Sequence, residues 1–363
     1  MKIRTLVISV ALLAILSAVA YLANRPASPA SKDPRVGKAV LEQDAATQAA
    51  CIVITDQGKR VELARGPDGS WRVTSYFDLP ADFDKIARFV QDLAEAKVER
   101  FVTASPERLA RMEFKDSAVS IRDAAGKEIW SVTLGKTPEN GNGRFIRFGD
   151  EPKAFFSGLH VWLDTDAKGW ANAQIVPVKP EDVAKIEIPF AGAEPIVIAR
   201  AKKDSPWAAK APAGQKLSAD KAASVLSALA TLRFSDTTDP KDASAAEAGS
   251  FMRTFRLTTF DGKTLDVGLG RKPEEKKLKP PVADAKEALA PPAKGADTKP
   301  EVKPITPEFD TIPAGPVFAV VSSSDAKAPI NELMKRRAFK VDDYSFTGLP
   351  QKPDELFEAD KAK

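Results

Sequence analysis

Apolar and polar positions follow the same pattern in two stretches of the chain. In the first stretch they alternate over residues 52–54 and 61–64, on either side of a turn, which predicts a β-hairpin. Apolar residues recur at helical spacing after Asp82, and a second hairpin is predicted over residues 119–134. A short helix is expected over residues 106–112. The predicted long helix would bury Phe83, Ile86, Val90, Leu93 and Ala94.

The second stretch repeats this layout. Strands are predicted over residues 186–188 and 196–199, a helix after Asp220, and a hairpin over residues 255–269. The apolar face of this second helix would consist of Ala222, Val225, Leu226, Leu229 and Leu232. The succession of strands, helix and strands predicts an α+β fold in which a helix covers an antiparallel sheet.

Six short sequence matches link the two stretches in the same order, at offsets of 133 to 138 residues. They are Ala64-Arg65 with Ala199-Arg200, Trp71 with Trp207, Leu79-x-Ala81-Asp82 with Leu217-x-Ala219-Asp220, Arg100-Phe101 with Arg233-Phe234, Gly126-Lys127 with Gly262-Lys263, and Leu134-Gly135-Lys136 with Leu269-Gly270-Arg271. We therefore predict one α+β unit built twice in tandem. Trp71 and Trp207 are expected to fill the same place in each core, the alternative being an exposed binding aromatic. Asp82 and Asp220 are expected at an N-cap or in a first helical turn.

These patterns divide the chain into successive segments. We expect a transmembrane anchor or signal over residues 1–24, a linker over 25–47, a first unit over 48–180, a second unit over 181–347 and a polar C-terminal tail over 348–363. The second unit is interrupted by residues 274–313, which contain eight prolines and almost no aromatic residues. This composition predicts a disordered or extended surface insertion.

The N-terminus indicates export. Lys2 and Arg4 precede an uncharged run over residues 5–23, which as a helix would be about as long as a membrane core is thick. Positive charge on the short side favours a cytoplasmic N-terminus and a translocated body. An uncleaved anchor is favoured by the length of the run, while residues 18–20 offer the small-x-small pattern of a cleaved signal peptide.

Composition and charge narrow the functional classes. The 54 basic and 50 acidic residues are interspersed, which argues against nucleic acid as a partner. A single cysteine, Cys51, leaves no intramolecular disulfide, and its apolar surroundings in the sequence predict a buried structural thiol.

Residues that suggest chemistry lack the partners that chemistry needs. His160 is the only histidine, and no nearby residues complete a zinc site or a catalytic triad. Ser218 with Lys221, and Ser324 with Lys327, match a lysine-activated serine motif, but such short matches are expected by chance in a lysine-rich chain. Residues 141–143 are expected to form a turn rather than a phosphate loop, and Asp164 and Asp166 would bind calcium weakly at most. We therefore predict no catalytic, cofactor-binding or metal-binding residues.

The chain resembles the bacterial membrane-anchored family called domain of unknown function 4340. The likeness rests on the N-terminal run, the strand ending in Val61-Glu62-Leu63-Ala64-Arg65, Trp71, Leu79-Pro80-Ala81-Asp82, the Gly126-Lys127 turn, Leu134-Gly135, Arg144-Phe145-Ile146-Arg147, and Trp170 before Ile175. This resemblance implies a single-pass inner-membrane protein with its body in the periplasm, often near ABC-type export components similar to gliding-motility transporters. It implies no catalytic residue.

Three functional hypotheses follow. The first is a non-enzymatic accessory or scaffold protein that binds a protein partner in a membrane complex. The second is a binding module for cell-envelope glycan or peptide in a crevice between the units, for which Trp162 and Trp170 are the candidate aromatics, although core packing is expected for both. The third is an uncharacterised hydrolase, which would need convergent polar groups in one deep pocket.

Overall fold

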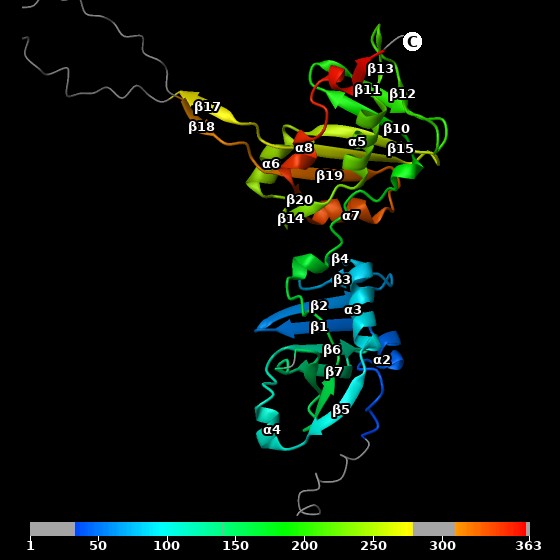
Figure 1. Cartoon of the computed structure of the whole chain (residues 1–363). Coiled ribbons are helices and arrows are strands. Elements are labelled where there is room, and N and C mark those ends of the chain that lie inside the picture. Colours follow the sequence, from blue (N-terminus) through cyan, green and yellow to red (C-terminus); the bar gives the residue numbers. More distant parts are fainter. Residues whose placement is uncertain (1–32, 140, 279–308, 361–363) are drawn as a thin grey trace, which may run out of the picture. The chain divides into compact units, whose positions relative to one another are not determined.

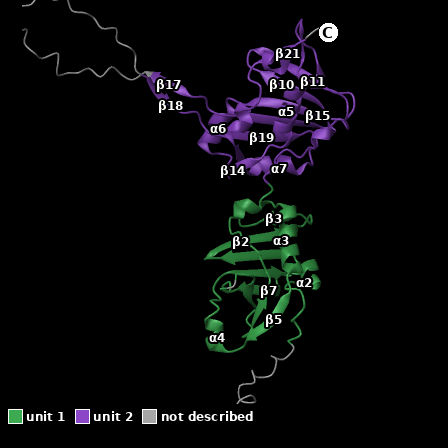
Figure 2. Cartoon of the chain, viewed as in Figure 1, with its two compact units in different colours: residues 1–172 green, residues 173–363 purple. Residues whose placement is uncertain are grey.

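All strand pairings in the described part of the chain are antiparallel, and helices pack beside the sheets, so the chain has the predicted mixed architecture (Figure 1). The computed structural model describes residues 33–139, 141–278 and 309–360. It divides into two compact units at Asn172 and Ala173 (Figure 2). The predicted anchor over residues 1–24 lies outside the described residues, and none of the helices within them has the length and apolar character to cross a membrane.

Unit 1 is built on one nine-stranded sheet with the order β4-β3-β2-β1-β6-β7-β8-β9-β5. Its strands are β1 (Cys51–Asp56), β2 (Lys59–Arg65), β3 (Trp71–Val73), β4 (Leu79–Pro80), β5 (Val98–Thr103), β6 (Ala118–Arg122), β7 (Glu128–Leu134), β8 (Arg144–Phe148) and β9 (Ala154–Ser157). Its helices are α2 (Gln43–Thr47), α3 (Phe83–Glu95) and α4 (Pro106–Ala110), with a short 3-10 turn η1 (Ala167–Trp170).

Unit 2 is built on an eight-stranded sheet with the order β12-β11-β10-β15-β16-β19-β20-β14. Its strands are β10 (Val183–Phe190), β11 (Ala193–Ala199), β12 (Ala208–Ala209), β13 (Gln215–Leu217), β14 (Phe234–Thr238), β15 (Arg253–Thr259), β16 (Thr264–Gly270), β17 (Glu275–Leu278), β18 (Phe309–Ile312), β19 (Val317–Ser323), β20 (Ala338–Val341) and β21 (Phe357–Ala359). Its helices are α5 (Ala219–Ala230), α6 (Ala243–Gly249), α7 (Pro329–Arg336) and α8 (Asp343–Thr347), with 3-10 turns η2 (Pro180–Asp182) and η3 (Pro353–Leu356).

The two sheets follow the same path. In each, the first hairpin (β1–β2 or β10–β11) lies beside the second hairpin (β6–β7 or β15–β16), and two more strands lead to the strand that follows the long helix (β5 or β14). Figure 1 shows α3 lying across the strands of unit 1 and α5 across those of unit 2. The apolar side of each long helix is buried, including Ile86 and Leu93 on α3 and Val225 and Leu229 on α5, whereas Phe83 is 62% exposed, contrary to expectation.

Near the start of each unit, a short segment forms backbone hydrogen bonds to the beginning of the edge strand that follows the long helix, β5 or β14, and to the chain just before it. In unit 1 the backbone N–H of Val40 donates to Ala96 and that of Val98 to Lys38; in unit 2 the N–H of Ile175 donates to Leu232 and that of Phe234 to Ala173. We call residues 37–41 and 173–176 the lead-in segments. The prediction of a linker over 25–47 is therefore wrong from residue 33 onward, because Val40 and Leu41 are buried in the core of unit 1.

The long helices begin at corresponding residues, two positions away from the predicted match. Asp82 is the N-cap of α3, and its carboxylate accepts the N–H of Lys85 at 3.1 Å. Ser218 is the N-cap of α5, without a side-chain cap bond, and Asp220 lies in the first turn. The N–H groups of the two N-cap residues donate to equivalent partners, Asp82 to Trp170 and Ser218 to Leu356. The match of Asp82 with Asp220 is therefore out of register.

The C-terminal segment is part of unit 2 and not a free polar tail. Leu349 and Leu356 are buried at 2% and 0% exposure, and β21 pairs with β13. The backbone carbonyl of Leu356 has the role in unit 2 that the carbonyl of Trp170 has in unit 1, because each accepts the N–H of a helix N-cap, and both side chains are buried. The predicted insertion over 274–313 is also structured at both ends, where β17 pairs with β18; residues 279–308 lie outside the described residues.

Each unit has a tryptophan with an arginine over its ring, but the two tryptophans differ in how deeply they are buried. The guanidinium of Arg65 lies 5.4 Å from the Trp71 ring centroid, and that of Arg200 lies 4.6 Å from the Trp207 ring centroid. Trp71 is 8% exposed and belongs to the core, but Trp207 is only half-buried. The predicted core role is confirmed for Trp71 and holds only in part for Trp207.

Candidate functional site

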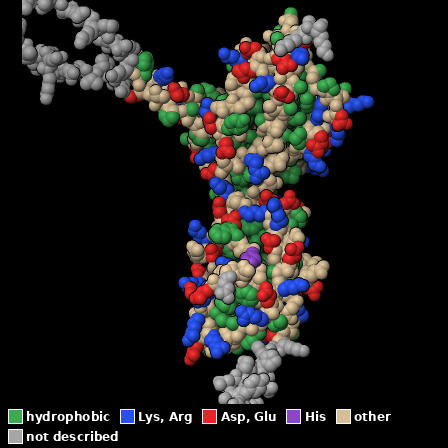
Figure 3. Space-filling model, viewed as in Figure 1, with side chains coloured by type: hydrophobic (Ala, Val, Ile, Leu, Met, Phe, Trp, Pro, Cys, Tyr) green, Lys and Arg blue, Asp and Glu red, His purple; other side chains and the backbone are tan. Residues whose placement is uncertain are grey.

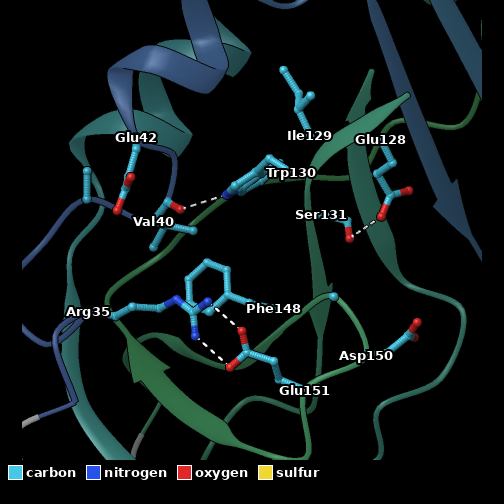
Figure 4. A pocket seen from close by; sticks show the side chains of 12 residues that line it. Arg35, Val40, Glu42, Glu128, Ile129, Trp130, Ser131, Phe148, Asp150 and Glu151 are labelled. Atoms are coloured by element: carbon cyan, nitrogen blue, oxygen red, sulfur yellow. Dashed lines mark hydrogen bonds and ion pairs between the residues drawn. The ribbon is translucent and has the colours of Figure 1, made fainter. Parts of the chain in front are cut away.

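A concavity of about 440 Å³ lies in unit 1 beside the start of β7 and the end of β8 (Figure 4). It is bordered by the lead-in segment, the start of β7 and the turn after β8. The indole N–H of Trp130, on β7, donates to the carbonyl of Val40 at 3.0 Å. This bond joins the lead-in segment to the sheet, so the shape of the concavity depends on elements distant in sequence.

Arg35 forms the basic side of this concavity. Its guanidinium donates two hydrogen bonds to the Glu151 carboxylate, at 2.7 and 2.5 Å, and lies 4.8 Å from the Phe148 ring centroid (Figure 4). The hydrogen bond from Arg35 lowers the pKa of Glu151, and the same bond raises the pKa of Arg35. Both side chains are about one-third exposed, so the pair remains open to solvent and to a ligand.

Unit 2 has a concavity at the corresponding end of its sheet, with a volume of about 710 Å³. Pro177 and Val178 follow its lead-in segment, Leu265 occupies the strand position of Trp130, and Ser323 ends the strand equivalent to β8. Both concavities thus lie beside the start of β7 or β16 and the end of β8 or β19, but the second is lined by residues that follow its lead-in segment rather than by the lead-in segment itself.

The two concavities differ in charge. The first is lined by one basic and four acidic side chains, namely Arg35, Glu42, Glu128, Asp150 and Glu151. The second is lined by four basic and three acidic side chains, namely Lys179, Lys203, Lys263, Lys327, Asp182, Asp261 and Asp325. Lys203 pairs with Asp182 at 2.6 Å and Lys263 with Asp261 at 3.5 Å. The first concavity is therefore net negative and the second net positive. On the face drawn in Figure 3, charges of both signs are interspersed, in agreement with the sequence.

The residues considered for chemistry in the sequence belong to different elements of the two units. Cys51 is half-buried on β1, and burial together with the charge of Glu62 raises the pKa of its thiol, which disfavours the reactive thiolate. His160 is exposed, and Ser218 is buried at the start of α5. Ser324 accepts the backbone N–H of Thr264 at 2.9 Å, so its hydroxyl has a structural partner next to the second concavity.

Glycine-rich and acidic loop residues also have structural partners. Gly141 and Gly143 have positive φ values in the connection from β7 to β8, as expected for a turn. Asp164 accepts the N–H of Asp166 and pairs with Lys85, and Asp166 accepts the N–H of Lys168. No cluster of three or more His, Cys, Asp or Glu side chains suited to a metal ion is found within residues 33–139, 141–278 and 309–360.

The two candidate tryptophans have opposite environments. Trp170 is buried at 1% exposure, donates its indole N–H to the carbonyl of Asp164 and meets Phe89 edge to face. Trp162 is 84% exposed, so the expectation of core packing is wrong for this residue. The sequence contains a signal that could have shown this, because Trp162 stands on the polar side of an alternating run from Leu159 to Leu163.

Comparison with known proteins identifies one family. The family model described as Domain of unknown function (DUF4340) matches residues 71–249, a range that extends from β3 of unit 1 to α6 of unit 2. No curated protein and no solved structure gives a significant match.

Proposed function

Since the chain belongs to the DUF4340 family over residues 71–249, we propose that it is a non-enzymatic accessory or scaffold protein of a bacterial membrane complex. The uncharged run over residues 5–23 anchors it in the inner membrane, and the two units lie in the periplasm. The partner is a membrane protein of an ABC-type export system, as the family resemblance implies. We further propose that the units are tandem copies of one fold, a view supported by their shared strand order.

One observation carries the scaffold proposal. A concavity lies beside corresponding strand ends in both units, yet its lining is net negative in unit 1 and net positive in unit 2. Charged side chains at a surface fix the choice of partner and its orientation more than they add affinity. Two sites of opposite sign on equivalent frameworks therefore suit a protein that holds two different charged surfaces.

Location and partner binding are tested separately. Protease added to cells whose outer membrane has been opened should digest the folded part while a cytoplasmic marker survives. Resistance of the body in such cells, with digestion only after lysis, would refute the proposed location.

The full chain, tagged at its C-terminus, should co-purify from detergent-solubilised membranes with a membrane protein in stoichiometric amount. The double variant Lys179→Glu with Lys327→Glu reverses two charges in the unit 2 concavity and should lose this partner. Its matched control is Lys210→Glu with Lys221→Glu, which changes the same charge at two exposed lysines of unit 2 that do not line the concavity. Isolation of the chain as a lone monomer, or equal loss in both double variants, would contradict the scaffold.

A further inference from the structure

Trp162 is presented to solvent by the fold itself. Leu159, Val161 and Leu163 are buried, at 1%, 9% and 6% exposure, while His160 and Trp162 between them point outward. The buried neighbours fix the backbone, and the N–H of Asp164 donates to the Trp162 carbonyl at 3.1 Å. An indole that served packing would occupy one of the inward positions of this alternating run.

The indole borders a groove of about 460 Å³ between α3 and the segment that contains it. The buried rings of Phe89 and Trp170 form the floor, with ring centroids 5.4 Å apart. Charged side chains form the walls; these are Asp82, Lys85, Arg88, Asp92 and Asp164. The volume falls within the range of pockets that bind small molecules.

Part of the wall is held in place by contacts of Lys85. The Lys85 ammonium donates to Asp164 at 2.6 Å and to the carbonyl of Gly169 at 2.8 Å, and it lies 4.4 Å from the Trp170 ring centroid. The Asp82 carboxylate accepts the N–H of Lys85. Arg88 and Asp92 are exposed one turn apart on the same side of α3. Lys85 and Asp164 therefore stand at fixed positions in a groove that the exposed indole of Trp162 borders.

From this geometry we infer that the groove beside Trp162 binds a saccharide. A pyranose ring has one face of C–H groups, which stacks on the negative face of an indole, and hydroxyl groups around its edge that bond to carboxylates and guanidinium groups. A solvent-exposed indole beside paired acidic and basic side chains matches both features.

A peptide fits the groove less well. Recognition of an extended peptide uses a free strand edge, and recognition of a helix uses a long apolar trough. This groove lies between a helix and a segment with no free strand edge, and its apolar floor is already buried by packing. The inference rests on the proposed location only in that it assumes saccharides of the cell envelope as the natural ligands.

Binding is measured by calorimetric titration of the purified full chain with chitotriose and with maltotriose, in a zwitterionic detergent that has no sugar headgroup. At least one of the two trisaccharides should bind. Trp162→Ala should weaken that binding about tenfold or more, as removal of a central aromatic anchor does. Trp162→Phe, which keeps a smaller ring, should weaken it by less.

Tyr344→Ala is the matched control, because Tyr344 is 81% exposed and lies in unit 2. Its affinity for the saccharide should equal that of the unchanged chain. The inference is overturned if neither trisaccharide binds, if Trp162→Ala binds as tightly as the unchanged chain, or if a tripeptide binds at Trp162 while the saccharides do not. These results do not depend on co-purification of a membrane partner, so failure of the saccharide site and failure of the scaffold proposal are distinguishable.

Discussion

Gly135, which follows β7, and Gly270, which ends β16, each lie close against a backbone carbonyl of their unit. A Cβ atom added at Gly135 would lie 2.6 Å from the carbonyl oxygen of Met112, and one added at Gly270 would lie 2.5 Å from that of Ala248. Ordinary contacts between carbon and oxygen are about 3.3 Å or longer, so the backbone at Met112, just after α4, or at Ala248, in the last turn of α6, would have to move by most of an ångström. In unit 1 that carbonyl also accepts the N–H of Lys136 at 2.8 Å.

The expected cost combines two opposing effects. Overpacking of this kind destabilises a protein by about 1–3 kcal/mol. Replacing glycine by alanine also stabilises by about 0.4–1 kcal/mol, because the unfolded chain loses conformational freedom. We therefore expect Gly135→Ala and Gly270→Ala each to lower the free energy of unfolding of its own unit by about 1–2 kcal/mol.

Hydrogen exchange followed by mass spectrometry at increasing urea concentrations measures the two units separately. Gly135→Ala should speed exchange in strands of unit 1 and leave unit 2 unchanged, and Gly270→Ala should do the reverse. Gly249→Ala is the control, since no atom lies within 4 Å of its added Cβ and its φ is not positive, so this variant should be neutral or slightly stabilised. If both test variants exchange their amide hydrogens at the wild-type rate, close packing does not require glycine at position 135 or 270.

Three further predictions address other parts of the fold. Trp71→Ala should destabilise unit 1 by about 3–5 kcal/mol, whereas Trp207→Ala should cost unit 2 clearly less, because Trp207 is only half-buried; equal losses in urea titrations would contradict this. Glu151 has a pKa lowered by Arg35, so the stability it contributes is present above the unfolded pKa of about 4.3 and is lost as the pH falls through its lower folded pKa. Arg35→Ala should therefore reduce the urea midpoint of unit 1 at pH 7 and make little difference well below pH 4; a constant difference across this range would count against the ion pair. Leu356→Ala should destabilise unit 2 by about 2–5 kcal/mol, as measured by hydrogen exchange in α5 and β13, and an unchanged exchange rate would show that the C-terminal segment is dispensable.

Local patterns in the sequence identified the elements because each depends on neighbouring residues. The Gly126-Lys127 and Gly262-Lys263 turns were predicted as hairpins, and both glycines have positive φ at those turns. All five residues of the predicted apolar face of the second long helix are buried. Alternation and helical spacing report which side of an element faces the core, and that information is local.

Register between the two units was harder to predict. The motif with Asp82 was matched to Asp220, and Arg100-Phe101 to Arg233-Phe234, at offsets that differ from the structural one. In the structure Asp82 corresponds to Ser218, and Val98 corresponds to Phe234, both 136 residues apart. Serine and aspartate serve equally as N-caps, and any apolar residue can occupy the first inward position of a strand. Identical residue types in two segments of the sequence therefore do not establish that the residues are structurally equivalent.

The burial of segments that are held only by tertiary contacts could not be predicted from the sequence for a different reason. Val40 and Leu41 form an isolated apolar pair in a polar stretch, and no periodicity marks them as core. They are buried because the lead-in segment bonds to the end of α3 and the start of β5. The C-terminal segment is similar, because Leu349 and Leu356 stand in a polar stretch of the sequence but are buried in unit 2.

The concavities follow from the same tertiary contacts. Each lies where one strand of the sheet begins and the next ends, beside the chain that forms or follows a lead-in segment. The charged side chains at such a rim have little packing to maintain, in contrast to Gly135 or Trp71, which the core constrains. The unit 1 concavity could thus become acidic and the unit 2 concavity basic without cost to either core. Differences between two equivalent frameworks are therefore most informative about function at these openings, where stability does not dictate the residue.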